Sequence, residues 1–477
     1  MKKLINYINK NKVYFVFLLF VLCMSIFLMC FVRRDSDYFW HIKAGEYMFH
    51  NGILRKDIFS WFVSGKYWMS HEWLFEIIIF SISLIFPKIH IMIYSYIFIL
   101  LLLLIITITN KKNILKNIPF SLLWISLSLI LIPFIQGRPH LISFNLLAIT
   151  IWILYDNFIN VNSKKIYFLP VVAVLWSNLH GGSSNLVYLL SFIFIFAGLF
   201  NFNFTKIESK RICKKQITKY IVIALLCMIC ININIHGFKM FIYPYQNMMD
   251  KTMLNNISEW APTNLNNFGH YAYLLFVSFI LFVMLFSKSK IKFIDLLLFG
   301  FCIVLGFKSI RFWAYTYIIM SFVIFNYINK RKLDKGTISM LGIISILLLI
   351  FTISNYKMID KQLNYKYLDN KIIDIIKDEN PKRLYNMYDY GGELVYNDIK
   401  VFIDGRADLY TKYNYKDYLN ISNLNDDYVK LINKYNFDYF LVSKKYPINT
   451  YLKYNDNYDI VYKNKNYVLY KNKETIN

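Results

Sequence analysis

The polar segment that follows the first apolar run carries several carboxylates among aromatic side chains, including Asp35, Asp37, Glu46 and Glu72. Tryptophan and tyrosine favour the headgroup zone of a membrane. A carboxylate held beside that apolar boundary has its charged form disfavoured, which raises its pKa and suits it to accept a proton. A carboxylate of this segment could therefore act as a general base. The alternative is a set of solvated acids in an aromatic belt.

Histidines, arginines and further acids collect at the ends of other apolar runs. Seven of the eight histidines come out on one outer face, in the outer loops or at the outer ends of runs, and only His90 lies one or two residues inside a run. Ionisable groups at a membrane boundary are usually functional, and arginine suits bidentate contact with phosphate. The alternatives are helix caps and side chains that snorkel to the headgroups. The candidate substrate-binding residues are His41, Glu46, Arg138, His180, His236, Glu259, Lys308 and Arg311.

The composition, 57% hydrophobic and 17% charged, is that of a multi-span membrane protein. The net charge of +25 could suggest nucleic acid as a partner. However, residues 1–354 hold 34 Lys/Arg against 12 Asp/Glu, whereas residues 355–477 hold 20 against 17. The excess belongs to the membrane half, where short loops on one side collect basic residues, so nucleic acid is not indicated.

Eleven apolar runs are long enough, or nearly long enough, to cross a hydrocarbon core of ~30 Å. They fall at about residues 13–32, 89–109, 118–136, 141–158, 166–180, 185–200, 218–235, 271–287, 293–307, 312–328 and 337–354. A shorter run, 72–86, contains Glu76, and we place it at the membrane surface as part of an outer loop, 33–88. With this count, the loops on the N-terminal side carry 21 Lys/Arg, which predicts a cytoplasmic N-terminus.

The expected architecture is an all-α membrane domain, residues 1–354, with large outer loops at 33–88 and 236–270. A small extracytoplasmic α/β domain, residues 355–477, follows it. Its expected helices are 364–379 and 425–435, and its expected strands are 383–388, 400–403, 438–442, 458–462 and 466–471. Asp404 and Arg406 follow one of these strands, where ligand sites commonly form. They are candidates for acceptor binding or a lid, with a structural turn as the alternative.

No Walker, GxGxxG, HExxH or GxSxG motif is present, and the six cysteines have no zinc-ligand or disulfide spacing. The sequence therefore indicates no cofactor; a divalent metal is compatible with it but not indicated. The free energy for a reaction must therefore come from the substrate itself and not from ATP hydrolysis. Carboxylates that can accept a proton and basic side chains that can bind phosphate lie beside the bilayer. This combination suits a sugar donor linked to polyprenyl phosphate.

The sequence resembles the GT-C superfamily of lipid-linked-sugar glycosyltransferases, and within it a group of bacterial membrane proteins. The resemblance covers nearly the whole chain. It rests on Asp35-Ser36-Asp37, Trp40-His41 to Gly45, Asp57 to Ser60, Trp73-Leu74, Arg138-Pro139, Trp176 to Gly182, His236-Gly237, Glu259-Trp260, Tyr390-Gly391-Gly392 and Asp404-Gly405-Arg406.

The resemblance implies that the catalytic base is Asp37 or Asp35, because the superfamily places this acid in the first outer loop. It also implies transfer of a sugar from a polyprenyl-phosphate donor to an outer glycan, lipid or protein acceptor, with inversion, at a bacterial plasma membrane. The motif is Asp-Ser-Asp rather than adjacent acids, and no WWD signature of oligosaccharyltransferases is visible. A lipid-linked glycan transporter and a non-catalytic membrane assembly protein are the alternatives.

Overall fold

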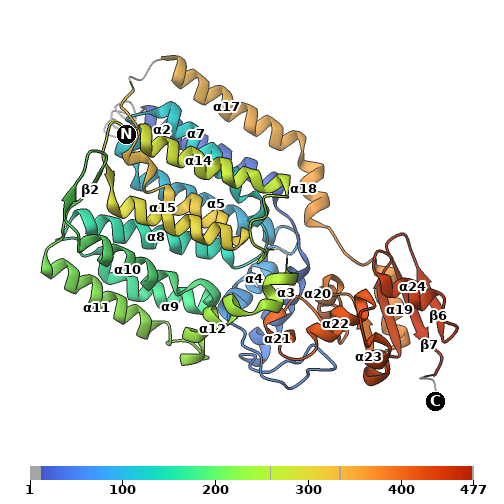
Figure 1. Ribbon diagram of the computed structural model, residues 1–477. Helices are drawn as coiled ribbons and strands as arrows, with labels where there is room; N and C mark the ends of the chain where they lie inside the picture. The colour runs from blue at the N-terminus through green and yellow to red at the C-terminus, as the bar shows by residue number, and fades with distance from the viewer. Residues whose placement is uncertain (1–11, 258, 332–334, 475–477) are drawn as a thin grey trace. The chain divides into compact units, whose positions relative to one another are not determined.

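The computed structural model describes residues 12–257, 259–331 and 335–474, and these fall into two compact units (Figure 1). The first unit holds the described residues up to Arg33 together with 91–249 and 254–363. The second holds residues 34–90, 250–253 and 364–477. The basic N-terminal segment lies almost wholly outside the described residues.

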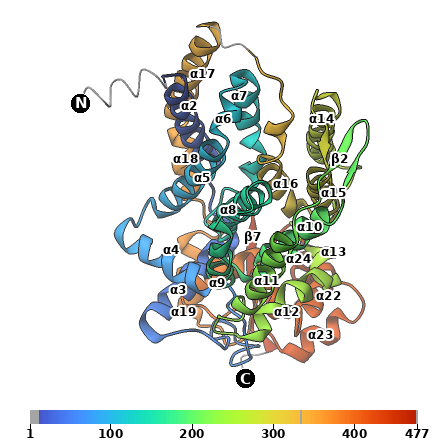
Figure 2. The same ribbon diagram turned by 90° about the vertical axis from the view of Figure 1, so that its left-hand side faces the viewer.

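The first unit is helical because its long Ile, Leu and Phe runs can satisfy their backbone hydrogen bonds in a membrane only within a helix. Its helices of eight or more residues are α2 (Lys12–Leu28), α5 (His90–Thr109), α7 (Ile118–Ser126), η2 (Leu127–Phe134), α8 (His140–Ile159), α9 (Leu169–Leu179), α10 (Leu186–Gly198), α11 (Lys214–Cys230), α12 (Phe238–Met249), α14 (Tyr271–Phe286), α15 (Phe293–Lys308), α16 (Trp313–Met320), α17 (Lys335–Ser354) and α18 (Tyr356–Leu363). Helices α2 and α17 pack along each other, as do α10 and α11 (Figure 2).

Six helices among the described residues are long and apolar enough to cross a membrane. They are Lys12–Phe31, His90–Thr109, His140–Ile159, Gly181–Gly198, Phe268–Phe286 and Gly336–Ser354. Every one of the eleven predicted spans contains helical structure, but several helices are shorter than a full crossing. The count of eleven spans therefore stays a prediction.

Loops that were predicted to share the N-terminal side contact one another. Strand β2 (Ile207–Ser209) pairs with β1 (Phe202–Asn203) and, in parallel, with β3 (Ile291–Lys292), which joins loops 201–217 and 288–292. In the same way Arg331 N donates to Lys116 O over 2.9 Å. The two loops of each pair therefore lie on one side of the helices, and the orientation of the protein in the membrane stays a prediction.

The second unit is built on a four-stranded sheet of order β4-β5-β7-β6, in which only the β4–β5 pair is parallel. The strands are β4 (Leu384–Asn386), β5 (Tyr439–Ser443), β6 (Tyr458–Lys463) and β7 (Tyr467–Asn472). The helices are α3 (Ser36–Asn51), α4 (Trp73–Ile85), α19 (Asn370–Glu379), α20 (Tyr388–Tyr396), α21 (Ala407–Tyr410), α22 (Tyr415–Asn423), α23 (Tyr428–Tyr435) and α24 (Pro447–Lys453).

The predicted strand 400–403 is not part of this sheet. Val401 instead forms a single bridge to Ser60, with Val401 N donating to Phe59 O and Trp61 N donating to Val401 O, both over 3.1 Å. The indole of Trp61 donates to Leu384 O over 3.0 Å, beside the sheet. The first outer loop therefore packs against the C-terminal segment, and both belong to the second unit. The predicted domains, 1–354 and 355–477, had assigned these two segments to different domains.

A labelling experiment tests the predicted orientation. Asn425 is exposed between α22 and α23, and native Cys213 is exposed just before α11. A membrane-impermeant maleimide added to intact cells should label an Asn425→Cys variant, and should reach Cys213 only after permeabilisation. A Cys213→Ser variant, which lacks this thiol, shows which part of the labelling after permeabilisation comes from Cys213. Labelling of Cys213 in intact cells would reverse the orientation.

Candidate functional site

The two candidate bases differ in what their carboxylates do. Asp35 is the N-cap of α3, where its Oδ1 accepts from Tyr38 N over 3.1 Å, and the residue is only 9% exposed. Asp37 is half-buried in the first turn of the helix. A negative charge at this end of a helix is favoured by the helix dipole. Asp35 is thus engaged in capping, whereas Asp37 lies two residues further along, within the first turn of the helix.

Glycines of the C-terminal segment pack directly on the first turn of α3. A Cβ atom at Gly405 would lie 1.7 Å from Asp37 Oδ1 and 3.0 Å from Trp40 Nε1. A Cβ atom at Gly392 would lie 2.1 Å from Ser36 O. Only glycine permits such approaches, so both glycine-containing motifs of this segment position the helix that carries Asp37.

Arg406 is completely buried between two aspartates. Its Nε and Nη2 donate to the two oxygens of Asp404 over 2.8 and 2.6 Å, and its Nη1 donates to Asp57 Oδ1 over 2.5 Å. Burial alone would lower the pKa of the guanidinium, but the charges of Asp404 and Asp57 hold that pKa well above its ordinary range. Asp404 and Arg406 have almost no exposed surface. This geometry favours the structural turn over the substrate-binding role.

His41 joins α3 to α4 through two glutamates. Its Nδ1 lies 3.2 Å from Glu76 Oε1, and its Nε2 lies 3.4 Å from Glu72 Oε2. His41 is 2% exposed and Glu76 is 1% exposed. The close approach depends on Gly45, where a Cβ atom would lie 2.1 Å from Glu76 O. The sequence identified His41 as a candidate but gave no role to Glu76.

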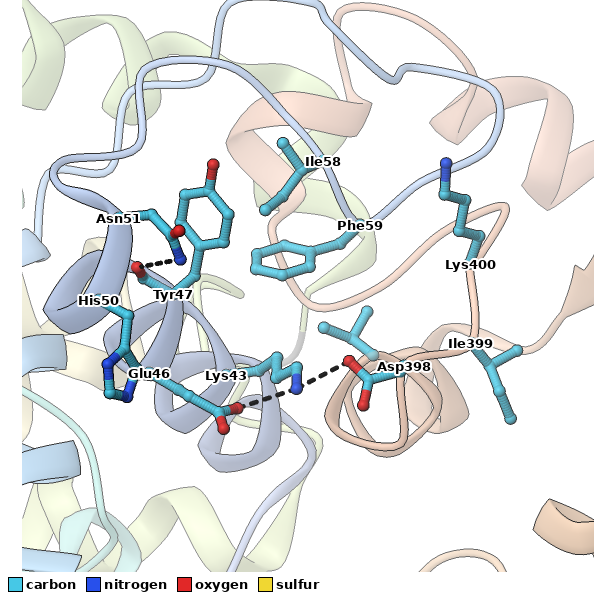
Figure 3. Close-up of a pocket in the computed structure, with 11 residues that line it drawn as sticks. Lys43, Glu46, Tyr47, His50, Asn51, Ile58, Phe59, Asp398, Ile399 and Lys400 are labelled. Carbon is cyan, nitrogen blue, oxygen red and sulfur yellow. Dashed lines mark hydrogen bonds and ion pairs between the residues drawn. The ribbon is translucent and has the colours of Figure 1, made fainter. Parts of the chain in front are cut away.

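Glu46 lies at a cavity of about 400 Å³ in the second unit (Figure 3). Lys43 Nζ lies 2.8 Å from Glu46 Oε2 and 2.7 Å from Asp398 Oδ1. Burial alone would lower the pKa of the Lys43 ammonium, but hydrogen bonds to Asp398 and Glu46 raise it above its ordinary value. Tyr47 and Phe59 also line the cavity. Charged groups beside aromatic rings can hold a molecule with both polar and apolar faces, such as a sugar.

Four predicted residues of the first unit meet in one network. Arg138 Nη1 lies 3.4 Å from Glu259 Oε2, and Arg311 Nη1 lies 3.8 Å from Glu259 Oε1. Arg311 Nη2 also lies 2.9 Å from His180 Nε2, and Ser143 Oγ lies 2.6 Å from His180 Nδ1. Two guanidinium groups thus share one carboxylate, which leaves a partly exposed surplus of positive charge suited to a phosphate.

The two other candidates of the first unit lie in connections that adjoin this network. The turn of His236 is bonded to the end of α9, since Asn234 Nδ2 donates to Ser177 O over 2.7 Å, and Lys308 lies three residues before Arg311. His236 is 8% exposed in the turn before α12, where Gly237 has a φ of +54°. His236 N donates to Asn234 Oδ1 over 2.9 Å, which fixes this turn. Lys308 is the exposed last residue of α15, and it is absent from the ion pairs of the Arg138 network among the described residues.

The buried Arg406 network gives a stability prediction. Removing one partner of a buried ion pair typically costs about 3–5 kcal/mol, so Arg406→Ala should clearly lower the thermal unfolding midpoint of the purified protein. The control is Lys434→Ala, which removes an exposed pair with Asp417 at 2.9 Å and should cost at most ~1 kcal/mol. An Arg406→Ala protein that unfolds like the wild type would return Arg406 to the candidate ligand-binding residues.

Solved structures that are similar to this chain include three of the oligosaccharyltransferase AglB of Archaeoglobus fulgidus. The structure tethered to an acceptor peptide aligns with a TM-score of 0.56 and 13% identity, covering 92% of this chain and 70% of that one. The complex with an inhibitory peptide and a dolichol-phosphate aligns with a TM-score of 0.52 and 12% identity, covering 91% and 70%.

The apo form aligns with a TM-score of 0.51 and 12% identity, covering 89% of this chain and 69% of that one. No protein-family model matches the sequence, and no curated protein matches it. Despite the low identity, the chain shares the fold of this archaeal oligosaccharyltransferase over most of its length.

Proposed function

We propose that this protein is a membrane glycosyltransferase that moves a sugar from a polyprenyl-phosphate donor to an extracytoplasmic acceptor at a bacterial plasma membrane. The observation that carries the proposal is the fold shared with an oligosaccharyltransferase over 92% of the chain. That enzyme was solved with a dolichol-phosphate and a peptide, which supports a lipid-linked donor and an acceptor in general. The acceptor class here is a glycan, lipid or protein of the cell envelope.

The residues supply the chemistry of an inverting transfer. Arg138 and Arg311, with His180 and His236, bind the donor phosphate and stabilise the charge that develops on it as it leaves. Asp37 takes the proton of the acceptor hydroxyl or amide group. The acceptor atom then forms a bond to the anomeric carbon, the bond from that carbon to the phosphate oxygen breaks, and the lipid phosphate departs.

The choice of Asp37 over Asp35 rests on their hydrogen bonds. Asp35 Oδ1 already accepts the Tyr38 backbone N–H, and a cap of this kind stabilises a protein by typically ~1 kcal/mol. A base that gave up this bond during each turnover would loosen the helix on which it sits. Asp37 has a structural constraint of a different kind, the close backbone of Gly405, which fixes its position without removing its charge.

Substitution of the two acids tests the proposal. In a membrane assay that follows sugar release from polyprenyl phosphate, Asp37→Asn should lower the rate by ~10²–10⁴, the usual effect of losing a general base. Asp35→Asn should transfer sugar at nearly the wild-type rate, because asparagine is an equally good N-cap. Normal expression of both variants is the control. Wild-type rates in both variants and in the double variant would favour a transporter or an assembly protein.

The Gly405 contact makes a second prediction for the same assay. Gly405→Ala places a methyl group where Asp37 Oδ1 now lies, so the carboxylate must move and the rate should fall strongly. The matched control is Gly300→Ala, because a Cβ atom at Gly300 meets nothing within 4 Å. An unchanged rate in Gly405→Ala would show that the position of Asp37 does not matter to transfer.

A further inference from the structure

The cavity of about 400 Å³ lies along the same helix as the proposed base (Figure 3). It is lined by residues of α3 between 43 and 51, by residues 58 and 59 of the first outer loop, and by residues 398–400 after α20. All of these residues belong to the second unit. Pockets that hold small molecules typically measure roughly 300–1,000 Å³, so the cavity is large enough for one.

Lys43 is the centre of a row of charged side chains in this cavity. Its Nζ lies 2.8 Å from Glu46 Oε2 and 2.7 Å from Asp398 Oδ1. Lys43 is largely buried, whereas the side chains of Glu46 and Asp398 are 43% and 74% exposed, so both carboxylates are open to a ligand. Lys400 adds a second ammonium group, and with a neutral His50 the lining carries no net charge. It therefore offers hydrogen-bond donors and acceptors together, without a preference for an anion or a cation.

Asp398 enters this row from an unfavourable backbone conformation. Its φ is +64°, in the left-handed region that glycine adopts most readily. Ile399 N donates to Leu394 O over 3.0 Å and Asp398 N donates to Val395 O over 3.1 Å, and helices that end with this pair of bonds usually have glycine at the position of Asp398. A carboxylate kept where glycine is preferred points to a use for its side chain.

Aromatic and aliphatic side chains complete the lining. Figure 3 shows the rings of Tyr47 and Phe59, with Ile58, above the row Glu46–Lys43–Asp398. The hydroxyl group of Tyr47 makes no hydrogen bond among the described residues. A sugar ring has an apolar C–H face that packs on an aromatic ring, and hydroxyl groups at its edge that both donate and accept. An acyl chain would leave the charged row without polar partners, and an anionic group would meet two exposed carboxylates.

We propose that this cavity binds one unit of a neutral glycan, and, on the basis of the proposed function, that the acceptor of the transfer is a carbohydrate. Lys43 follows Asp37 by six residues, which is a rise of about 9 Å along α3 and about a third of a turn around it. The cavity therefore lies beside the proposed base and not on it. A glycan of several units can have one unit held here while another unit presents its hydroxyl group to Asp37.

Direct binding to the full-length protein tests the inference without an activity assay. The protein is placed in lipid nanodiscs, because detergents with sugar headgroups could themselves occupy the cavity. The probes are short neutral oligosaccharides released by mild acid from the envelope polysaccharide of the producing cells. We expect saturable binding by calorimetry, and nuclear magnetic resonance should show saturation transfer from the protein to the C–H protons of the sugar. The absence of saturable binding to the wild type, or binding of envelope-derived peptides in place of the oligosaccharides, would overturn the inference.

Asp398→Gly separates a ligand-binding role from a structural one. It should weaken oligosaccharide binding at least about tenfold, because a charged hydrogen-bond partner is lost. It should leave the thermal unfolding midpoint unchanged or raise it, because glycine relieves the left-handed conformation. The matched control is Asp427→Gly: Asp427 also has a positive φ, +67°, and an ion pair of 2.6 Å with Lys430, but it lies outside the cavity.

Tyr47→Ala is the second variant, and it should also lower the affinity for the oligosaccharides because it removes an aromatic ring from the lining. Wild-type affinity in both Asp398→Gly and Tyr47→Ala would show that the glycan binds elsewhere and would reject the site. In the transfer assay, Asp398→Gly should raise the KM for a glycan acceptor more than it lowers kcat, whereas Asp37→Asn should act on kcat.

The two proposals fail in different ways. If Asp37→Asn releases sugar at the wild-type rate while the oligosaccharides still bind and Asp398→Gly weakens them, the transfer reaction is wrong and the glycan site stands. If Asp37→Asn silences sugar release but no oligosaccharide binds to the wild type, the transfer reaction stands and the carbohydrate acceptor is wrong.

Discussion

The second unit depends on a single buried cation. A guanidinium group without water around it must be surrounded by acceptors, because an unpaired buried charge costs several kcal/mol. Arg406 finds them in Asp404, two residues away, and in Asp57, which is 349 residues away in the chain. The planar fork of arginine fixes the direction of each bond. The hydrogen bonds of Arg406 therefore join the first outer loop to the C-terminal segment. They also hold Gly405 against the helix that carries Asp37.

The sequence predicted the helical fold, the α/β character of the C-terminal segment and one group of site residues. Arg138, His180 and Arg311 could be grouped from the sequence because each lies beside the outer end of an apolar run, and Glu259 because it lies in an outer loop; a membrane brings such segments to one side. Four of the five predicted strands overlap the observed strands, because short apolar runs are visible in the local sequence.

Contacts between distant segments could not be predicted in this way. The predicted strand at Val401 to Ile403 has the composition of a strand, but its partner is Ser60, and no local pattern identifies a partner more than 300 residues away. Glu76 was treated as an obstacle to membrane crossing, although burial against His41 gives it a partner. A signal was present: a glutamate within an apolar run is expensive unless it is paired, and Gly45 permits the close approach.

The two units differ in how their ionisable side chains are paired. In the first unit, two arginines share the single carboxylate of Glu259, so the network attracts anions. In the second unit, the buried guanidinium group of Arg406 is matched by the two carboxylates of Asp404 and Asp57. Within the second unit the two acids of the Asp35-Ser36-Asp37 motif differ in position. Asp35 is the N-cap and accepts a backbone N–H, whereas Asp37 is the second residue of the helix. Two acids separated by one residue therefore put one carboxylate at the cap and the other in the first turn, where the proposed base lies against Gly405.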